Sequence, residues 1–329
     1  MVTHMQLKSS SVRISGGLGN QLFQYAFSRN LTINTGSVVV LDLERYGLEH
    51  GNNSRRCELS GLFPGATFLN TMRSSTVKYL LENLPTRLKH KLLVRIESKI
   101  RIRNTFKGRR IVLERKIPYD SSVPLQDCNY YVGNFISPEY WWGNQELILK
   151  EIDYAVSISA VGANIPLPSK NSIAVHIRRG DYLDNKKTRE FHGYCKDTYY
   201  LEALKILREE NEFLNTVLIS SDNSDYARYF SAKVQAMGFR VSLIENLDPV
   251  SNLFVLSRAH YFVGSNSTFS WWAAFLGNQK STVFPQRWFM DHNIEINADR
   301  FYPSAPFLLD DALTSEPDNS YREATMEKR

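Results

Sequence analysis

The first 43 residues alternate between strand and helix signals, and this alternation points to a parallel α/β fold. Residues 11–15 (SVRIS) predict a short strand that runs into a glycine turn, GGLGN, at residues 16–20. The following QLFQYAFSRNLTI has the apolar spacing of a helix, which Gly36 closes, and residues 37–43 (SVVVLDL) predict a second strand. Strand, helix and strand in this order form the unit from which parallel sheets are built.

The second half of the chain repeats this alternation. Strands are predicted at residues 172–178, 216–221 and 261–264, with helices at residues 197–210 and 250–259 between them. A second parallel sheet is therefore expected.

Two domains are expected from the length of the chain. Its 329 residues exceed the usual size of one hydrophobic core, and the proline-containing run at residues 164–169 predicts a linker. We predict an N-terminal domain of residues 1–168, a second domain of residues 169–310 and a disordered, charged tail of residues 311–329.

The composition is that of an ordinary globular protein, with 43% apolar and 22% charged residues. The sequence contains no run of about 18 apolar residues and no signal-peptide pattern at its N-terminus, so a cytoplasmic location is expected. Cys57, Cys128 and Cys195 are an odd count without a CxxC pair. Reduced thiols are predicted rather than a disulfide framework or a zinc site.

Basic residues are concentrated between Arg87 and Arg110, where Glu97 is the one acidic residue. Residues 71–107 have helical apolar spacing broken by Pro85, which predicts an amphipathic pair of helices. A solvated helix face accounts for most of these charges. A second interpretation is peripheral contact with anionic lipid at the inner face of the plasma membrane. Nucleic acid is not expected as a partner, because aromatic stacking groups are sparse in this stretch.

Two polar side chains are predicted to converge at the end of the strand IAVHIRR. Alternation places His176 and Arg178 on one face, and Arg179, Gly180 and Asp181 begin the following loop. Ligands of open α/β sheets bind at the carboxyl ends of the strands, where the Arg178 guanidinium could meet a phosphate. A structural ion network with Asp181 or another carboxylate is equally consistent with this segment alone.

Polar side chains follow three more strand candidates. In VGSNSTFSWWAA, Ser267, Thr268 or Ser270 could cap a helix whose first turn binds an anion, while Trp271 and Trp272 are assigned to the core. In GGLGNQ, the glycines Gly17 and Gly19 allow close backbone approach, and Asn20 and Gln21 could bind a sugar; a tight turn with a helix cap is equally open. In ISSD, Asp222 could cap a helix, which we favour, or accept hydrogen bonds from a ligand beside Ser221.

Metal motifs are absent from these clusters: the sequence contains no HExxH, paired Cys-His set, DxD pair or Walker sequence there. We therefore expect no catalytic metal and no cofactor, so arginine must neutralise any phosphates.

Four segments together, GGLGNQLFQYAFSRN, HIRRGDY, VLISSDNSDYARYF and GSNSTFSWWAAFLG, closely resemble the alpha-1,2-fucosyltransferase family, in which HxRRxD is the signature. The resemblance covers the first 45 residues and most of residues 172–285. It implies a GT-B-like architecture, with two Rossmann-like parallel-sheet domains facing a cleft. Residues 1–168 would then be the acceptor-side domain, and residues 169–310 the donor domain that holds most of GDP-fucose.

The resemblance also implies roles for single residues. Arg178 would stabilise the GDP leaving group, and His176 would lie beside the nucleotide. Arg179 and Asp181 would shape the loop, and Thr268 and Phe269 would lie at the phosphates. Related enzymes often hold guanine with an aspartate where this chain has Asn252, so base selectivity could depend instead on Asp222 or Asp248. The donor-binding residues that we predict are Gly17, Gly19, Asn20, His176, Arg178, Arg179, Ser221, Asp222, Asn252, Ser267, Thr268 and Phe269.

The implied reaction transfers L-fucose from GDP-β-L-fucose to the 2-hydroxyl of a galactose-type acceptor, with inversion. Arg178 is the predicted catalytic arginine, and candidate bases are Asp181, Glu190 and His192, with Asp42 and Glu44 across the cleft. Acceptor stacking on Phe135, Tyr140 and Trp141 and burial of these rings in the core are equally open.

The acceptor is expected to be a β-galactoside oligosaccharide or a lipid-linked glycan of O-antigen or related synthesis. Alternatives are a fucosyltransferase of another linkage, a transferase using another GDP-sugar and a glycan-binding protein.

Overall fold

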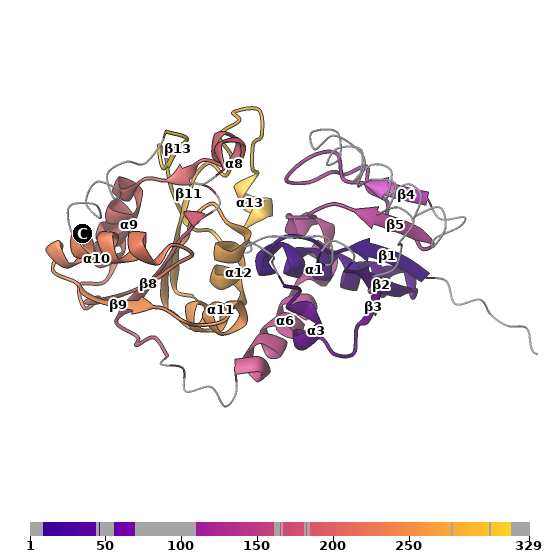
Figure 1. Cartoon of the computed structure of the whole chain (residues 1–329), viewed down its shortest axis with the longest axis horizontal. Coiled ribbons are helices and arrows are strands. Elements are labelled where there is room, and N and C mark those ends of the chain that lie inside the picture. Colours follow the sequence, from indigo (N-terminus) through magenta and orange to yellow (C-terminus); the bar gives the residue numbers. More distant parts are fainter. Residues whose placement is uncertain are drawn as a thin grey trace, which may run out of the picture.

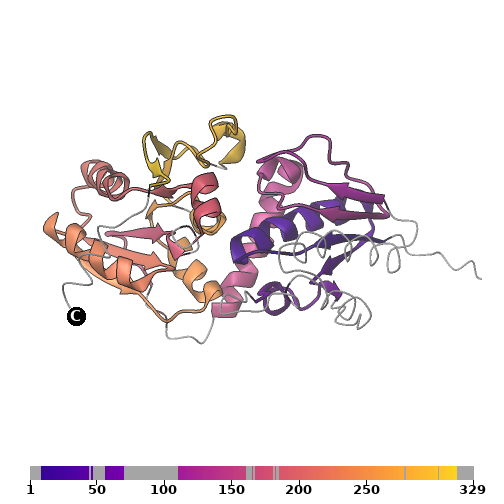
Figure 2. The same cartoon turned by 45° about the horizontal axis from the view of Figure 1, so that its top comes forward.

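Two α/β domains lie side by side, each built around a parallel sheet (Figure 1). Turning the molecule by 45° shows the same two domains (Figure 2). The predicted fold class, with two Rossmann-like parallel-sheet domains, is confirmed. The structure, a computed structural model, describes residues 9–43, 46, 56–69, 110–160, 165, 167–180, 182, 185–277, 279–302 and 304–316.

The N-terminal domain contains a sheet in the order β3-β2-β1-β5-β4, with all described pairings parallel. The predicted strand-helix-strand unit is confirmed, and Gly36 ends α1 in the left-handed conformation, with φ of 65°. The elements are β1 (Ser9–Arg13), α1 (Leu18–Thr35), β2 (Val38–Asp42), α3 (Leu59–Leu62), β3 (Thr67–Leu69), β4 (Arg110–Leu113), β5 (Asn129–Val132), η1 (Pro138–Tyr140), η2 (Trp142–Asn144) and α6 (Gln145–Ala160).

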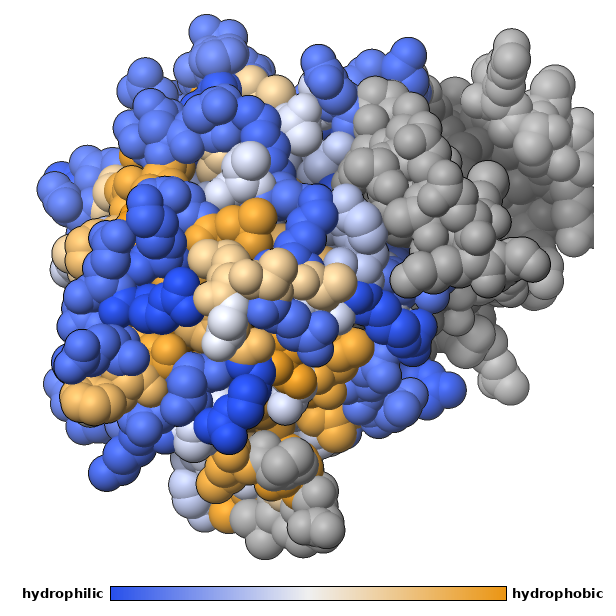
Figure 3. All heavy atoms as spheres, turned by 90° about the vertical axis from the view of Figure 1, so that its left-hand side faces the viewer, coloured by the Kyte–Doolittle hydropathy of each residue, from blue (hydrophilic) through white to orange (hydrophobic). Residues whose placement is uncertain are grey.

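The C-terminal domain contains a parallel sheet in the order β12-β11-β10-β6-β8-β9. Seen end-on from this domain, the surface is largely hydrophilic, with apolar areas between the polar side chains (Figure 3). The elements are β6 (Ser172–Ile177), α8 (Lys186–His192), β7 (Tyr194–Cys195), α9 (Asp197–Glu210), β8 (Thr216–Ser221), α10 (Ser224–Ala236), β9 (Arg240–Ile244), α11 (Pro249–Ser257), β10 (Tyr261–Val263), α12 (Thr268–Leu276), β11 (Ser281–Pro285), α13 (Ala298–Phe301), β12 (Phe307–Leu309) and β13 (Leu313–Thr314).

The start of the predicted tail is ordered, which corrects the expectation of disorder from residue 311 onward. β13 pairs antiparallel with β7. Two side chains also donate hydrogen bonds to this segment: Arg189 Nε to the Ser315 carbonyl at 3.1 Å and Tyr194 Oη to the Glu316 carbonyl at 2.7 Å. The charge of residues 311–316 concealed these backbone contacts. Residues 317–329 lie outside the described residues.

The helices α1, α6, α11 and α12 form one apolar layer between the two sheets (Figure 1). The ring centroid of Phe23 on α1 lies 4.8 Å from that of Trp271 and 5.0 Å from that of Trp272 on α12. Trp141 stacks on Trp272 at 5.8 Å from the other side. One continuous hydrophobic core therefore joins the domains, and burial of these rings supplies much of its stabilisation.

The aromatic cluster proposed for acceptor stacking belongs to this core. Phe135 and Trp141 are completely buried, and Tyr140 is 3% exposed. Phe135 stacks on Phe27 of α1 at 4.0 Å. The interpretation as core is confirmed, and stacking of a sugar on these three rings is wrong because no face of them is exposed.

The two domains are in close contact at Gly19. A Cβ atom on this residue would lie 2.5 Å from the Phe269 backbone nitrogen and 2.6 Å from the Thr268 carbonyl carbon. The Gly19 carbonyl also accepts a hydrogen bond from Trp272 Nε1 at 3.0 Å. Glycine is required here because backbone on both sides leaves no room for a side chain.

We expect Gly19→Ala to lower the free energy of unfolding by about 1–3 kcal/mol, because the added methyl group forces α1 and α12 apart. Thermal unfolding followed by circular dichroism measures the change. Gly61→Ala is the matched control, since a Cβ atom on Gly61 would meet nothing within 4 Å. Equal unfolding midpoints for the two variants would show that this contact is dispensable.

The predicted helix pair at residues 71–107, and the basic stretch except Arg110, lie outside the described residues. Both stay predictions. None of the helices in the described part of the chain has the length and apolar character needed to cross a bilayer.

Candidate functional site

A pocket of about 570 Å³ lies between the two domains. Its C-terminal wall is formed at the carboxyl ends of β6, β8 and β10, where ligands of parallel sheets bind. Its N-terminal wall is formed by the turn before α1 and by three loops, and its described residues are Gly17, Leu18, Gly19, Asn20, Arg56, Glu58, Ile117, Asn134 and Ile136.

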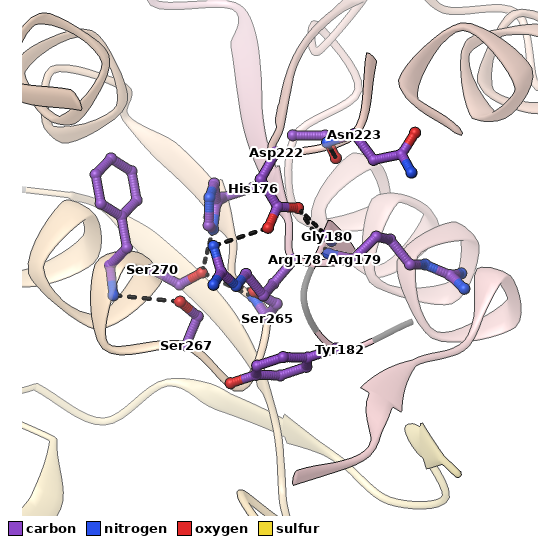
Figure 4. A network of polar contacts seen from close by, with 12 residues as sticks. His176, Arg178, Arg179, Gly180, Tyr182, Asp222, Asn223, Ser265, Ser267 and Ser270 are labelled. Atoms are coloured by element: carbon purple, nitrogen blue, oxygen red, sulfur yellow. Dashed lines mark hydrogen bonds and ion pairs between the residues drawn. The ribbon is translucent and has the colours of Figure 1, made fainter. Parts of the chain in front are cut away.

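His176 lies at the end of β6, with its ring on the predicted face. Its Nδ1 is hydrogen-bonded to Ser270 Oγ at 2.6 Å, and its ring centroid lies 4.9 Å from that of Phe269 (Figure 4). Burial lowers the pKa of His176 below its ordinary value, so the ring is neutral at pH 7. A neutral imidazole beside an anion site supplies hydrogen bonds rather than charge.

Arg178 follows β6 and lines the pocket with its guanidinium. Nη1 forms an ion pair with Asp222 Oδ2 at 2.7 Å, and the Arg178 side chain is 24% exposed. Asp222 Oδ1 also accepts the backbone N–H groups of Arg179 at 2.7 Å and Gly180 at 3.0 Å. Asp222 thus fixes both the loop after β6 and the direction of the Arg178 side chain.

The prediction that Asp222 caps the next helix is wrong. Asn223 caps α10, with its side chain accepting the Tyr226 backbone N–H at 2.9 Å. Asp222 lies one residue too early, where its carboxylate turns towards the arginine loop (Figure 4).

Arg179 does not face the pocket, which corrects its place among the donor-binding residues. Its side chain extends away from that of Arg178 (Figure 4) and is 1% exposed. The guanidinium lies between the rings of Tyr194 and Tyr226, at 4.3 and 3.9 Å from their centroids, and pairs with Asp197 at 3.0 Å. The second arginine of the motif therefore anchors the loop to the domain core.

The N-terminus of α12 faces the pocket beside Arg178. Of the three candidate caps, Ser267 caps the helix, accepting the Phe269 backbone N–H at 3.3 Å. Thr268 Oγ1 donates to Asn20 Oδ1 of the other domain at 2.7 Å. The backbone amides of the first turn carry the positive end of the helix dipole, which suits an anion.

In the GGLGNQ turn, the Gln21 side chain holds backbone groups in place rather than facing the pocket. Gln21 is fully buried; its Nε2 donates to the carbonyls of Gly16 and Arg56 at 3.1 and 2.9 Å, and its Oε1 accepts the Glu58 N–H at 2.9 Å. The idea that Gln21 binds a sugar is therefore wrong. Gly17 and Asn20 line the pocket, whereas Gly19 is required by packing.

Asn252 and Ser221 also line the pocket, as predicted for the donor site. The Asn252 amide is paired with the Ser220 hydroxyl, with Nδ2 to Oγ at 2.9 Å. Asp248, the other candidate for guanine recognition, instead caps α11, with Oδ1 accepting the Val250 N–H at 2.9 Å. Its carboxylate is thus hydrogen-bonded to the backbone of the helix.

The candidate bases occupy different positions. His192 lines the pocket, with its ring stacked on Tyr182 at 5.1 Å. Glu190 is 57% exposed, pairs with Lys186 at 3.7 Å and does not line the pocket. Its position therefore does not suit a catalytic base. Asp42 is also excluded, because it is 2% exposed and accepts a hydrogen bond from Tyr130. Asp181 and Glu44 lie outside the described residues.

Sequence reasoning missed the loop that carries Arg56 and Glu58, although both residues line the pocket. Gln21 ties this loop to the start of α1 through the hydrogen bonds given above. The aromatic residues Trp288 and Phe289 were missed as well. None of them lies in a recognisable motif, since only tertiary contacts bring them here.

Among the residues that the structure describes, no group of three His, Cys, Asp or Glu side chains is placed to hold a metal ion. Arg56 and Arg178 are the arginines among the described residues that line the pocket. An anionic ligand there would be met by these guanidinium groups and by the amides at the start of α12.

A polar pocket between two Rossmann-like domains, with an arginine at a strand end beside a helix N-terminus, suits a ligand that carries phosphate groups, as the substrates of many glycosyltransferases do. Sequence comparison agrees, because the family described as Glycosyl transferase family 11 matches residues 9–303. The chain belongs to glycosyl transferase family 11.

Two relatives from Escherichia coli are similar along most of their length. The chain is 27% identical over 286 residues to an alpha-1,2-colitosyltransferase, covering 84% of this chain and 91% of the relative. It is 24% identical over 299 residues to the O-antigen biosynthesis glycosyltransferase WbnK, covering 85% of this chain and 95% of the relative.

Solved structures are similar at a lower level. POFUT1 in complex with GDP gives a TM-score of 0.46 at 12% identity, covering 84% of this chain and 98% of that chain. The E. coli ADP-heptose LPS heptosyltransferase II gives a TM-score of 0.45 at 12% identity, covering 97% of both chains. At these TM-scores the overall shapes agree only loosely.

Proposed function

We propose that the protein is an inverting, metal-independent fucosyltransferase that transfers L-fucose from GDP-β-L-fucose to the 2-hydroxyl of a galactose-type acceptor. The observation that carries the proposal is the convergence of Arg178 and the N-terminus of α12 on one pocket. A guanidinium and helix amides together form a diphosphate site that needs no metal ion. Membership of family 11 supports glycosyl transfer as the reaction.

The charge that develops on the leaving diphosphate explains why Arg178 matters for rate. As the bond from the sugar C1 to the phosphate oxygen breaks, its electron pair remains on GDP. Arg178 is held by Asp222 before the reaction, so little reorganisation is needed to stabilise that charge. The acceptor oxygen attacks C1 from the opposite face and loses its proton to a base, for which Asp181 and His192 stay candidates.

A second donor deserves comparison, because one relative bears the name alpha-1,2-colitosyltransferase. Colitose is the 3-deoxy counterpart of L-fucose, so both sugars fit the same reaction at C1. The name of the second relative favours an acceptor of O-antigen synthesis. We propose such a glycan, free or lipid-linked, as the acceptor.

The test is acceptor-stimulated release of GDP from GDP-fucose, GDP-colitose and GDP-mannose in EDTA, with a panel of β-galactosides. We expect turnover of GDP-fucose, and NMR of the product identifies the linkage. If GDP-colitose were turned over faster than GDP-fucose, colitose rather than fucose would be the proposed donor sugar. Turnover of no GDP-sugar with any acceptor would contradict the proposal.

We also propose peripheral contact between residues 87–110 and anionic lipid, on the basis of their charge. In liposome flotation, the protein should float with vesicles that contain phosphatidylglycerol and remain below with purely zwitterionic vesicles. Replacing Lys99, Arg101 and Arg103 with glutamine should weaken the binding. Equal flotation with both kinds of vesicle, or with neither, would contradict this contact.

A further inference from the structure

The pocket has two chemically different ends on either side of Arg178. Towards α8 it is aromatic, with Phe191, His192, Trp288 and Phe289 among its lining residues. Such rings suit the apolar faces of sugars. Towards α11 its lining consists of smaller polar and aliphatic groups. With the diphosphate at Arg178, as in the proposed function, this division would place the sugar at the aromatic end and the nucleoside at the α11 end.

Glu58 reaches the α11 end from the opposite domain. It lines the pocket, and its charge interacts with that of Asp248, the N-cap of α11. Its backbone N–H is fixed by the buried Gln21 side chain at 2.9 Å. This anchoring holds the residue at the domain junction, close to the wall that carries Leu247, Pro249 and Asn252.

Asp222 and Glu58 are the two carboxylates among the described residues that line the pocket, and they differ in their hydrogen-bond partners. Asp222 is used by Arg178 and by two backbone N–H groups. Among the described residues, the Glu58 carboxylate forms neither a hydrogen bond nor an ion pair. Burial and the nearby Asp248 raise the pKa of Glu58, while Arg56 opposes the shift. A half-buried carboxylate without a partner among the described residues is costly, so a ligand donor is its natural complement.

We propose that Glu58 is a specificity-determining residue that reads the guanine base of the donor from the N-terminal domain. Guanine presents N1–H and the 2-amino group side by side, and a carboxylate accepts both. Adenine presents an acceptor at N1 and is repelled. On the opposite wall, Asn252 Nδ2 donates to Ser220 Oγ at 2.9 Å, and its second N–H is a further donor for the base. This inference rests on the proposed use of a GDP-sugar.

The experiment compares the binding of GDP, IDP, ADP and 2′-deoxy-GDP by isothermal titration calorimetry to the wild type and to Glu58→Gln. IDP lacks the 2-amino group, so the wild type should bind GDP more tightly than IDP. Loss of a charged hydrogen-bond partner should weaken GDP binding roughly 10- to 100-fold. The preference for GDP over IDP should disappear in the variant.

The matched control is Glu202→Gln, an exposed glutamate of α9 that pairs with Lys205. It should leave all four affinities unchanged. An unchanged ratio of GDP to IDP affinity in Glu58→Gln would overturn the proposal, as would loss of discrimination against 2′-deoxy-GDP alone, which would assign Glu58 to the ribose. If Glu58→Gln unfolds, Glu58→Asp gives the same ratio test.

Failure of the proposed function gives a different result. A wild type that binds ADP but not GDP would contradict the GDP-sugar donor itself. A wild type that binds GDP through Arg178, with an unaffected Glu58→Gln variant, would overturn only the role of Glu58.

Discussion

Replacing Arg178 with alanine is expected to reduce turnover of the nucleotide sugar by about 10³-fold or more while the protein stays folded. The guanidinium lines the pocket beside the N-terminus of α12, so its loss removes the charge that stabilises the departing diphosphate. Asp222 is then left without its cationic partner at the same pocket, which repels the anion further. Initial rates of GDP release and a thermal unfolding curve measure the two quantities.

Arg228→Ala is the matched control for this prediction. Arg228 also forms ion pairs with carboxylates, Asp225 and Glu245, but it is 56% exposed and does not line the pocket. We expect wild-type rates from it. If Arg178→Ala kept a rate within about threefold of the wild type, electrostatic stabilisation by this arginine could not be the source of catalysis.

Replacing Arg179 with methionine is expected to have the opposite pattern, with a loss of about 2–4 kcal/mol in the free energy of unfolding. The side chain is 1% exposed, and its Nη2 donates to Tyr226 Oη at 2.6 Å and Asp197 at 3.0 Å. Methionine fills part of the volume but removes both hydrogen bonds and the stacked charge, while Asp197 keeps its ion pair with Lys233 at 2.6 Å. Urea unfolding followed by tryptophan fluorescence measures the change.

Arg228→Met serves as the control for stability, because an exposed ion pair contributes no more than about 1 kcal/mol. GDP affinity measured on folded Arg179→Met, at low temperature, should stay close to that of the wild type. If Arg179→Met had the free energy of unfolding of the wild type but no longer bound GDP, Arg179 would have to be a donor-binding residue after all.

The parallel fold could be predicted because its main strands carry strong local signals. β8 and α9 have the predicted bounds, and β6 ends one residue before the predicted end. β9, β11 and β12 were missed, since they are short and lack clear alternation; β11 (STVFP) is buried throughout and contains a proline. β13 was hidden by the charge of its surroundings, and its pairing with β7 is decided by tertiary contacts.

The site could be predicted on one wall only. Strand alternation correctly placed His176 and Arg178 together, because side-chain direction in a strand has a period of two. The buried position of the Arg179 side chain depends on hydrogen bonds to Asp197 and Tyr226, which lie 18 and 47 positions away in the sequence. Glu58 reaches the pocket through Gln21, 37 positions earlier. Such long-range contacts leave no local pattern in the sequence.

The most direct measurement is a crystal structure of the protein with GDP bound. The account predicts the diphosphate within hydrogen-bond distance of the Arg178 guanidinium and of the backbone amides at the start of α12, with the nucleoside towards α11. GDP bound elsewhere, or bound in the pocket with its phosphates away from Arg178, would contradict it.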